Sequence, residues 1–349
     1  MGRSNANTAK AWENSETHDP SEGVALKYRP LFPWFGGKSA IADEVWQAIG
    51  PDVDNYVEPF FGSGAALFLR PQVGRIETVN DADGFVANFW RAVKADPNAV
   101  AFYADNPVNE CDLHARHIWL VGHRESLTDR LMGDPEFFDA KAAGWWCWGQ
   151  CCWIGSGWCS GKGPWGAVDG VMTLRNAGRG VNRKLPHLGD AGQGVNRKLE
   201  WLREEIGYFA DRLRDVRVCC GDWSRVCTPS VTHRHRHGIT GVFLDPPYLE
   251  SANRTMGVYA KDCGDVAHAV RDWAIKEAGN PRMRIVLAGY ESEHDMPDDW
   301  SVVHWKARGG YSSTSANETQ GKANRGRERL WLSPACVQSG VESLYAGAL

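Results

Sequence analysis

Four consecutive residues, Asp245-Pro246-Pro247-Tyr248, carry the strongest chemical signal in the chain. They follow residues 241–244, an apolar run that predicts a strand, so an acid and two stiff prolines lie at the carboxyl edge of a sheet, where open α/β sheets bind ligands. This group suits the activation of an exocyclic amine on an aromatic base. The Asp245 carboxylate and the Pro246 carbonyl can accept the two amine hydrogens, and Tyr248 can stack on the base. The alternative interpretation is an ordinary proline-rich turn.

A second candidate site is the glycine-rich turn within residues 56–64, between a predicted strand and a predicted helix. Gly62 and Gly64 allow the backbone to approach a ligand closely. Asp81 comes at the end of the next strand, where a carboxylate suits the hydroxyls of a ribose. We therefore expect a nucleoside derivative as cofactor.

A third candidate is Lys38, which follows two glycines and lies close in the chain to Trp34. The run Gly37-Lys38-Ser39 is not a phosphate loop, because Phe32 stands where that loop requires a glycine. We expect Lys38 to bind a carboxylate with Trp34 packed beside it. The alternative is a solvated lysine at the start of a helix.

Together and in this order, the three segments resemble the DNA adenine-N6 methyltransferases of the D12, or adenine methylase, type. Residues 34–38 are similar to the amino-terminal element of that family, residues 58–64 to its S-adenosylmethionine loop, and residues 245–248 to its catalytic tetrapeptide. The resemblance covers residues 29–93 and 200–333, and its details are most similar to methylases of bacteriophages and prophages.

The resemblance implies a Rossmann-like class I fold with S-adenosylmethionine as methyl donor. The cofactor-binding residues that it implies are Trp34, Lys38, Glu58, Phe60, Gly62, Gly64, Asp81, Asp222 and Asp245. Trp34 and Lys38 would bind the methionine end, Asp81 the ribose and Asp222 the adenine. Asp245, Pro246 and Tyr248 would be the catalytic residues. One departure from the family is Asp83, where an Asn is common.

Short apolar runs that alternate with helix-like stretches must position these residues. The predicted strands are residues 55–58, 75–79, 216–219, 241–244, 284–288, 301–305 and 329–332. The predicted helices are residues 65–69, 84–93, 199–213 and 266–277. This pattern predicts an α/β fold with a seven-stranded, mostly parallel sheet.

The alternation is lost in residues 95–199, where we expect an inserted target-recognition region. The catalytic domain would then comprise residues 27–94 and 200–335, with tails at residues 1–26 and 336–349. Residues 141–199 carry eight Lys or Arg against two Asp, although the whole chain has a net charge of −4. This local positive charge favours contact with the phosphates of DNA.

Within this basic segment, one hexapeptide, Gly-Val-Asn-Arg-Lys-Leu, occurs twice. Its basic residues, predicted to bind DNA, are Arg183, Lys184, Arg197 and Lys198. The same segment is rich in tryptophan, whose rings can stack on unpaired bases or wedge a duplex open. We expect most of these rings to form a core instead; the five considered are Trp145, Trp146, Trp148, Trp153 and Trp158.

The sequence therefore predicts a site-specific enzyme that methylates the N6 amine of an adenine flipped out of double-stranded DNA. One alternative is a cytosine-N4 methyltransferase, which uses the same amine chemistry but more often has Ser in place of Asp245. The other is a DNA-binding protein that keeps the fold without catalysis. No prediction of the oligomeric state follows from the sequence.

Several classes of protein are disfavoured by composition and spacing. No uncharged run approaches the ~18 residues that a membrane span requires, and residues 1–23 contain no apolar signal-peptide core. The cysteines resemble neither a disulfide framework nor a paired zinc site. We expect a cytoplasmic protein without a bound metal.

Overall fold

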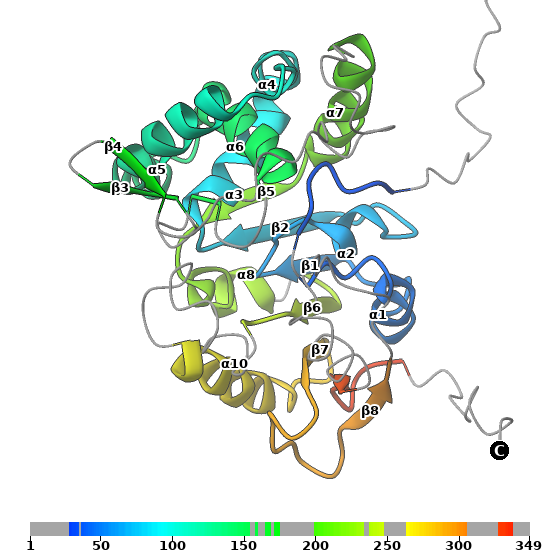
Figure 1. Cartoon of the computed structure of the whole chain (residues 1–349). Helices are drawn as coiled ribbons and strands as arrows, with labels where there is room; N and C mark the ends of the chain where they lie inside the picture. Colours follow the sequence, from blue (N-terminus) through cyan, green and yellow to red (C-terminus); the bar gives the residue numbers. More distant parts are fainter. Residues whose placement is uncertain are drawn as a thin grey trace, which may run out of the picture.

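The computed structural model describes residues 28–34, 36–153, 158–159, 165–168, 171–174, 199–233, 237–247, 263–305 and 327–337. These residues form a seven-stranded sheet with helices on both faces, and a two-stranded sheet of β3 (Trp165–Val168) and β4 (Val171–Leu174) (Figure 1). No described helix is long and apolar enough to cross a membrane.

The large sheet confirms all the predicted strands to within two residues at each end. Its strands are β1 (Asn55–Glu58), β2 (Ile76–Asp81), β5 (Arg217–Cys220), β6 (Thr240–Leu244), β7 (Met283–Tyr290), β8 (Ser301–His304) and β9 (Glu328–Leu332). They lie in the order β5-β2-β1-β6-β7-β9-β8. The pairs from β5 to β7 are parallel, and β9 is antiparallel to both of its neighbours.

The direction in which the chain progresses across the sheet reverses between β1 and β6. From β1 the chain moves outward through β2 to β5, and from β6 it moves the other way to β7. Open α/β sheets bind ligands at such a switch point, beyond the carboxyl ends of the strands. Strand order and direction confirm the predicted Rossmann-like methyltransferase fold.

Alternate residues of the strands face two different hydrophobic clusters, as the geometry of a strand requires. On one face, Val242 packs in a cluster with Val270 of α10 (Cys263–Glu277). On the other, Phe243 packs in a larger cluster that includes Val45 of α1 (Ala42–Ile49). The sheet therefore lies between two helical layers.

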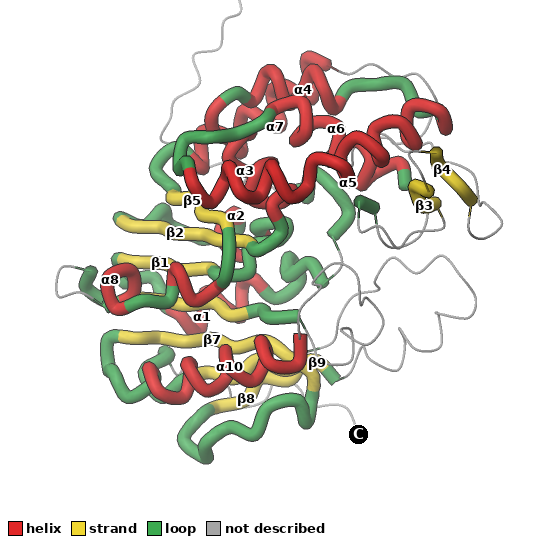
Figure 2. The backbone as a smooth tube through the Cα atoms, turned by 90° about the vertical axis from the view of Figure 1, so that its left-hand side faces the viewer, coloured by secondary structure: helices red, strands yellow, loops and turns green. Residues whose placement is uncertain are grey.

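The structure confirms the four predicted helices and adds others. The confirmed helices are α2 (Ala65–Phe68), α3 (Gly84–Ala95), α7 (Leu199–Leu213) and α10. The sequence did not predict α1, α4 (Pro97–Ala104), α5 (Glu110–Gly133), α6 (Ala140–Cys152), α8 (Pro229–Thr232) or the short 3-10 helix η1 (Trp223–Val226). Figure 2 shows α3 to α7 gathered at the end of the sheet that β5 forms.

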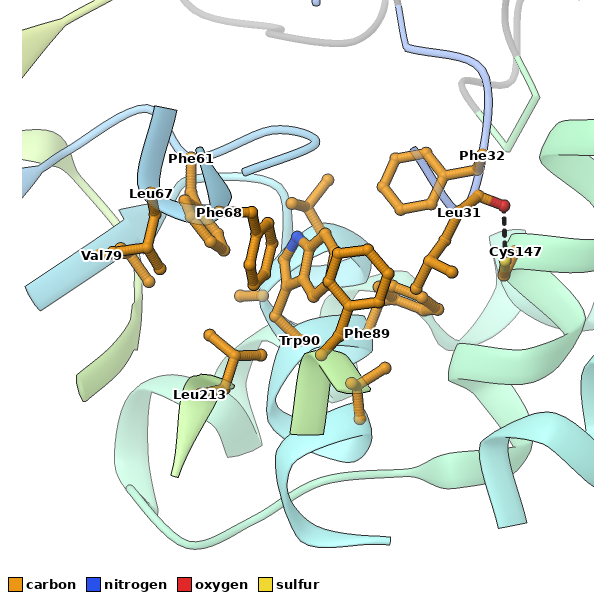
Figure 3. Close-up of a cluster of buried hydrophobic side chains, with 14 of the residues drawn as sticks. Leu31, Phe32, Phe61, Leu67, Phe68, Val79, Phe89, Trp90, Cys147 and Leu213 are labelled. Atoms are coloured by element: carbon orange, nitrogen blue, oxygen red, sulfur yellow. Dashed lines mark hydrogen bonds between the residues drawn. The ribbon is translucent and has the colours of Figure 1, made fainter. Parts of the chain in front are cut away.

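The helices of the predicted insertion share their core with the sheet. Trp90 of α3 contacts Phe32, Phe61 and Phe68 in the larger cluster (Figure 3). The same cluster contains buried Trp146, Trp148, Trp153 and Trp158, with Trp145 half-buried against it. The expectation that these tryptophans are mostly core is confirmed.

Candidate active site

Four acidic side chains lie at the end of the sheet where the parallel strands have their carboxyl ends, which we call the catalytic edge. Asp81 ends β2, Glu58 ends β1, and Asp245 directly follows β6. Glu328 begins β9, and because β9 is antiparallel, its amino end lies beside the carboxyl end of β7. Alternation along each strand directs all four toward the face that α1 covers, where Val79, Tyr56, Phe243 and Leu330 pack.

The lysine predicted to bind a carboxylate lies against the predicted catalytic acid. Lys38 Nζ is 2.9 Å from Asp245 Oδ2 and donates a hydrogen bond to the Gly36 carbonyl at 2.8 Å. The Lys38 side chain is 6% exposed and that of Asp245 is 20% exposed. An ion pair this well shielded fixes both groups, because breaking it leaves a buried charge without its partner.

The glycine-rich turn lies against Trp34. Gly62 and Gly64 have φ angles of 49° and 73°, in the left-handed region that favours glycine. A Cβ at Gly62 would collide with the Trp34 indole. The Trp90 indole donates to the Gly62 carbonyl at 2.8 Å, which ties the turn to the core.

Asp81 holds this turn through its carboxylate. That carboxylate accepts hydrogen bonds from the Gly62 amide at 2.9 Å and the Asp83 amide at 2.8 Å. Burial, with the nearby charge of Asp83, raises the pKa of Asp81 to about 7. The two backbone donors use only part of the acceptor capacity of a carboxylate.

Asp83, the departure from the family pattern, has a structural role. It is the N-cap of α3, where its carboxylate accepts a hydrogen bond from the Phe85 amide at 2.9 Å. Arg124 of α5 lies 3.5 Å from the same carboxylate oxygen. Asp83 thereby links α3 to α5.

The loops after β1 and β5 are joined by Asn80 of β2, a residue that the sequence analysis missed. Asn80 Nδ2 donates to the Pro59 carbonyl at 3.1 Å and to the Gly221 carbonyl at 2.9 Å. Beside these loops, the Phe60 ring stacks on Trp223, with centroids 6.5 Å apart. The sequence signal that could have identified Asn80 is its position directly before Asp81, the predicted ribose ligand.

Asp222 and Glu58, two of the predicted cofactor ligands, differ in their surroundings. Asp222 is exposed and caps η1, accepting a hydrogen bond from the Ser224 amide at 2.9 Å. Glu58 is buried and accepts a hydrogen bond from the Tyr56 hydroxyl at 3.0 Å. Burial raises the pKa of Glu58 well above its usual range, and the negative charge of Asp245 adds to the effect.

Glu328 belongs to this edge although the sequence analysis did not select it. Burial raises the pKa of its carboxyl group to about 7, while Lys38 lowers it and Asp245 raises it. Its Oε2 atom is buried and has no hydrogen-bond partner among the described residues. Candidate acids were expected at the ends of predicted strands, and Glu328 instead begins one.

Of the remaining predicted site residues, the structure describes only Pro246. Pro246 is buried directly after β6. Tyr248, Arg183, Lys184, Arg197 and Lys198 lie outside the described residues. Within the described part of the chain, no group of three or more His, Cys, Asp or Glu side chains could hold a metal ion.

This strand order, with a glycine-rich turn after β1 and an acid after β6, is that of a Rossmann-like methyltransferase. Residues 34–116 match the family model of the D12 class N6 adenine-specific DNA methyltransferases, which confirms the predicted resemblance. The matched range contains Lys38, Glu58 and Asp81, and supports DNA adenine methylation as the activity. No curated protein matches the chain.

Proposed function

We propose that the chain is a DNA methyltransferase that transfers a methyl group from S-adenosylmethionine to the N6 amine of an adenine flipped out of duplex DNA. The observation that carries the proposal is the Lys38–Asp245 ion pair at the switch point of the sheet. It joins the predicted catalytic acid to the segment that matches the D12 family.

The side chains at this edge fit the proposed donor. S-adenosylmethionine, when bound, supplies a methyl group on a positively charged sulfonium. Asp81 has acceptor capacity for ribose hydroxyls, and the left-handed turn at Gly62 lets the backbone come close to a nucleoside. Phe60 and Trp223 offer ring surfaces for the adenine, with Asp222 next to Trp223 in the chain. Trp34 and Lys38 would hold the methionine end.

Asp245 and Pro246 would act on the target amine. The Asp245 carboxylate accepts one amine hydrogen and the Pro246 carbonyl the other, which localises the nitrogen lone pair and makes the amine a better nucleophile. Lys38 keeps the carboxylate in place. Because these acceptors are fixed before the substrate arrives, little reorganisation accompanies the reaction.

The roles proposed for Tyr248 and for the basic residues of the duplicated hexapeptide rest on the sequence alone. Tyr248 would stack on the extruded base, whose flipping costs a few kcal/mol. Arg183, Lys184, Arg197 and Lys198 would bind phosphates on double-stranded DNA.

Cytosine-N4 methylation is the second candidate, because the amine chemistry is the same. The match to the adenine-specific family favours adenine. The Lys38–Asp245 pair favours an enzyme over a non-catalytic DNA-binding protein, because it holds the predicted catalytic acid in place at the switch point of the sheet.

The test is mass spectrometry of nucleosides from duplex DNA of mixed sequence incubated with protein and S-adenosylmethionine. We expect N6-methyldeoxyadenosine. N4-methyldeoxycytidine would support the second candidate. DNA binding without any methylated nucleoside would overturn the proposal in favour of the non-catalytic alternative.

A further inference from the structure

We propose that Glu328 is a positioning residue whose charge acts on Lys38 and so sets how strongly Asp245 accepts a hydrogen bond. The inference rests on the proposed function for its catalytic consequence. Its electrostatic part concerns only this chain's own residues.

The register of the sheet places Glu328 at the catalytic edge. Glu328 pairs with Tyr290, the last residue of β7, while Leu330 pairs with Ala288. Leu330, Ala288 and Phe243 pack in the same cluster, so Glu328 and Asp245 continue the same face of the sheet. This is the face that carries Lys38, shortly before α1.

The surroundings of Glu328 give it no other evident role. Its buried Oε2 lacks a hydrogen-bond partner among the described residues, and burying an unpaired carboxylate oxygen is costly. Lys38 is the cation that stabilises its charged form, and Asp245 is the anion that opposes it. Both partners of the catalytic ion pair therefore act on this one side chain.

Two arginines flank Glu328 in the chain. Arg329 donates a hydrogen bond from Nη1 to the backbone carbonyl of Glu328 at 2.9 Å. Arg329 lies 2.6 Å from Glu291 and pairs in register with His304 of β8. The Arg327 guanidinium lies over the Tyr290 ring, 5.6 Å from its centroid. The charges that act on the Glu328 carboxyl group are those of Lys38 and Asp245, and the charge of Asp245 also raises the pKa of buried Glu58. A change of charge at Glu328 therefore affects the proposed reaction through Lys38 and Asp245.

A change in the charge of Glu328 has a direct consequence for Asp245. When Glu328 is neutral, Asp245 receives the full attraction of Lys38. When Glu328 is ionised, Lys38 interacts with two carboxylates, and Asp245 becomes a stronger acceptor for the target amine. Because the pKa of Glu328 is about 7, the rate of methyl transfer should rise with pH through the neutral range.

The kinetic test compares Glu328→Gln and Glu328→Asp in single-turnover methyl transfer from pH 6 to 8.5 with both substrates saturating. We expect Glu328→Gln to lower the rate severalfold and to flatten the pH profile, because Lys38 then interacts with Asp245 alone. Glu328→Asp should restore part of the rate and the pH dependence. Glu291→Gln, a control on the adjacent turn, should keep the wild-type profile.

A second measurement does not depend on activity. In NMR of lysine labelled with ¹³C at Cε, with Lys38 assigned through Lys38→Arg, the Lys38 signal should shift near pH 7 as Glu328 ionises, and Glu328→Gln should abolish that shift. If the Lys38 signal behaves identically in both proteins, or if Glu328→Gln retains the wild-type rate and profile, the inference is wrong. A wild-type protein that methylates no nucleoside would contradict the proposed function, while the NMR result would still decide the electrostatic coupling.

Discussion

The Lys38–Asp245 pair couples two residues that are far apart in the sequence. A carboxylate directly after a strand has limited freedom, and the ammonium at 2.9 Å restricts it further. Such fixed acceptors are what the activation of a weakly nucleophilic amine requires. The proposed chemistry therefore depends more on Asp245 than on any other described side chain.

Replacing Asp245 by Ala should lower single-turnover methyl transfer by ~10²–10³, the usual cost of losing one preorganised group at a reacting centre. Asp272→Ala, which removes an exposed acid on α10, is the matched control and should leave the rate unchanged. Circular dichroism would verify that both variants fold. Near-normal turnover in Asp245→Ala would contradict the catalytic assignment.

Asp81 should make stability depend on pH. Its folded pKa of about 7 lies above the ordinary value of 3.8, so its contribution is fully present below pH 3.8 and is lost as pH rises through 7. At ~1.4 kcal/mol per pKa unit, the loss is at most about 4 kcal/mol. Urea unfolding at several pH values should show a shallower decline for Asp81→Asn than for the wild type. An identical decline in the two proteins would show that the pKa of Asp81 is not raised.

Most of the residues at the candidate site could be predicted from the sequence by their type and spacing, but Glu328 could not. Asp245 and Lys38 stand in short motifs whose spacing is visible in the chain. Glu328 has no motif, and only the antiparallel direction of β9 brings it to the same edge. That direction is a property of the assembled sheet, which a local pattern does not contain.

At the scale of elements, the glycine-rich turn is fixed by its contacts with the segment before α1. Gly62 packs against Trp34, donates its amide to Asp81 and accepts from Trp90. A side chain at this position would push apart two elements of the proposed donor site.

Gly62→Ala should therefore reduce both stability and donor affinity. The left-handed backbone alone costs about 1–2 kcal/mol for a residue with a Cβ. Gly207→Ala is the control, because Gly207 lies inside α7 and an added Cβ would have no atom within 4 Å. It should be stabilising by about 0.5–1 kcal/mol. Thermal unfolding and calorimetric titration would separate the two effects, and equal behaviour of the variants would contradict the role assigned to the turn.

Periodicity predicted the strands better than the helices between residues 95 and 199. Each strand is a short apolar run, whereas the 24 residues of α5 bury only a narrow stripe that includes Leu113, Leu120 and Leu127. In addition, α4, α5 and α6 follow one another without an intervening strand, so the alternation that indicates an α/β fold is absent there.

At the scale of the whole molecule, the charge of the chain is unevenly distributed. The net charge is −4, yet residues 141–199 carry an excess of basic residues. Identical hexapeptides are better suited to a repeating phosphate backbone than to two different bases. We therefore expect the two hexapeptides to contribute affinity for DNA without preference for one base sequence.

Replacing Arg183, Lys184, Arg197 and Lys198 together by Ala should weaken binding to target and non-target duplexes about equally. The slope of log K against log salt should fall by roughly 0.9 for each phosphate that the variant no longer binds. Fluorescence anisotropy at several salt concentrations would measure both quantities. Weakening confined to target DNA would mean that these residues read bases, and unchanged binding to both duplexes would mean that other residues bind the phosphates.

The shared hydrophobic core limits how such a protein can diversify. Phe32 packs on Trp146 with ring centroids 4.8 Å apart, and the thiols of Cys147 and Cys151 donate to the Leu31 carbonyl. A region that determines sequence preference could be exchanged between related enzymes only if the surface it packs on were compatible. If residues 95–199 are the predicted target-recognition region, grafting them into another enzyme would require the segment that carries Leu31 and Phe32 to be transferred with them. A new specificity should then be inherited together with this amino-terminal segment.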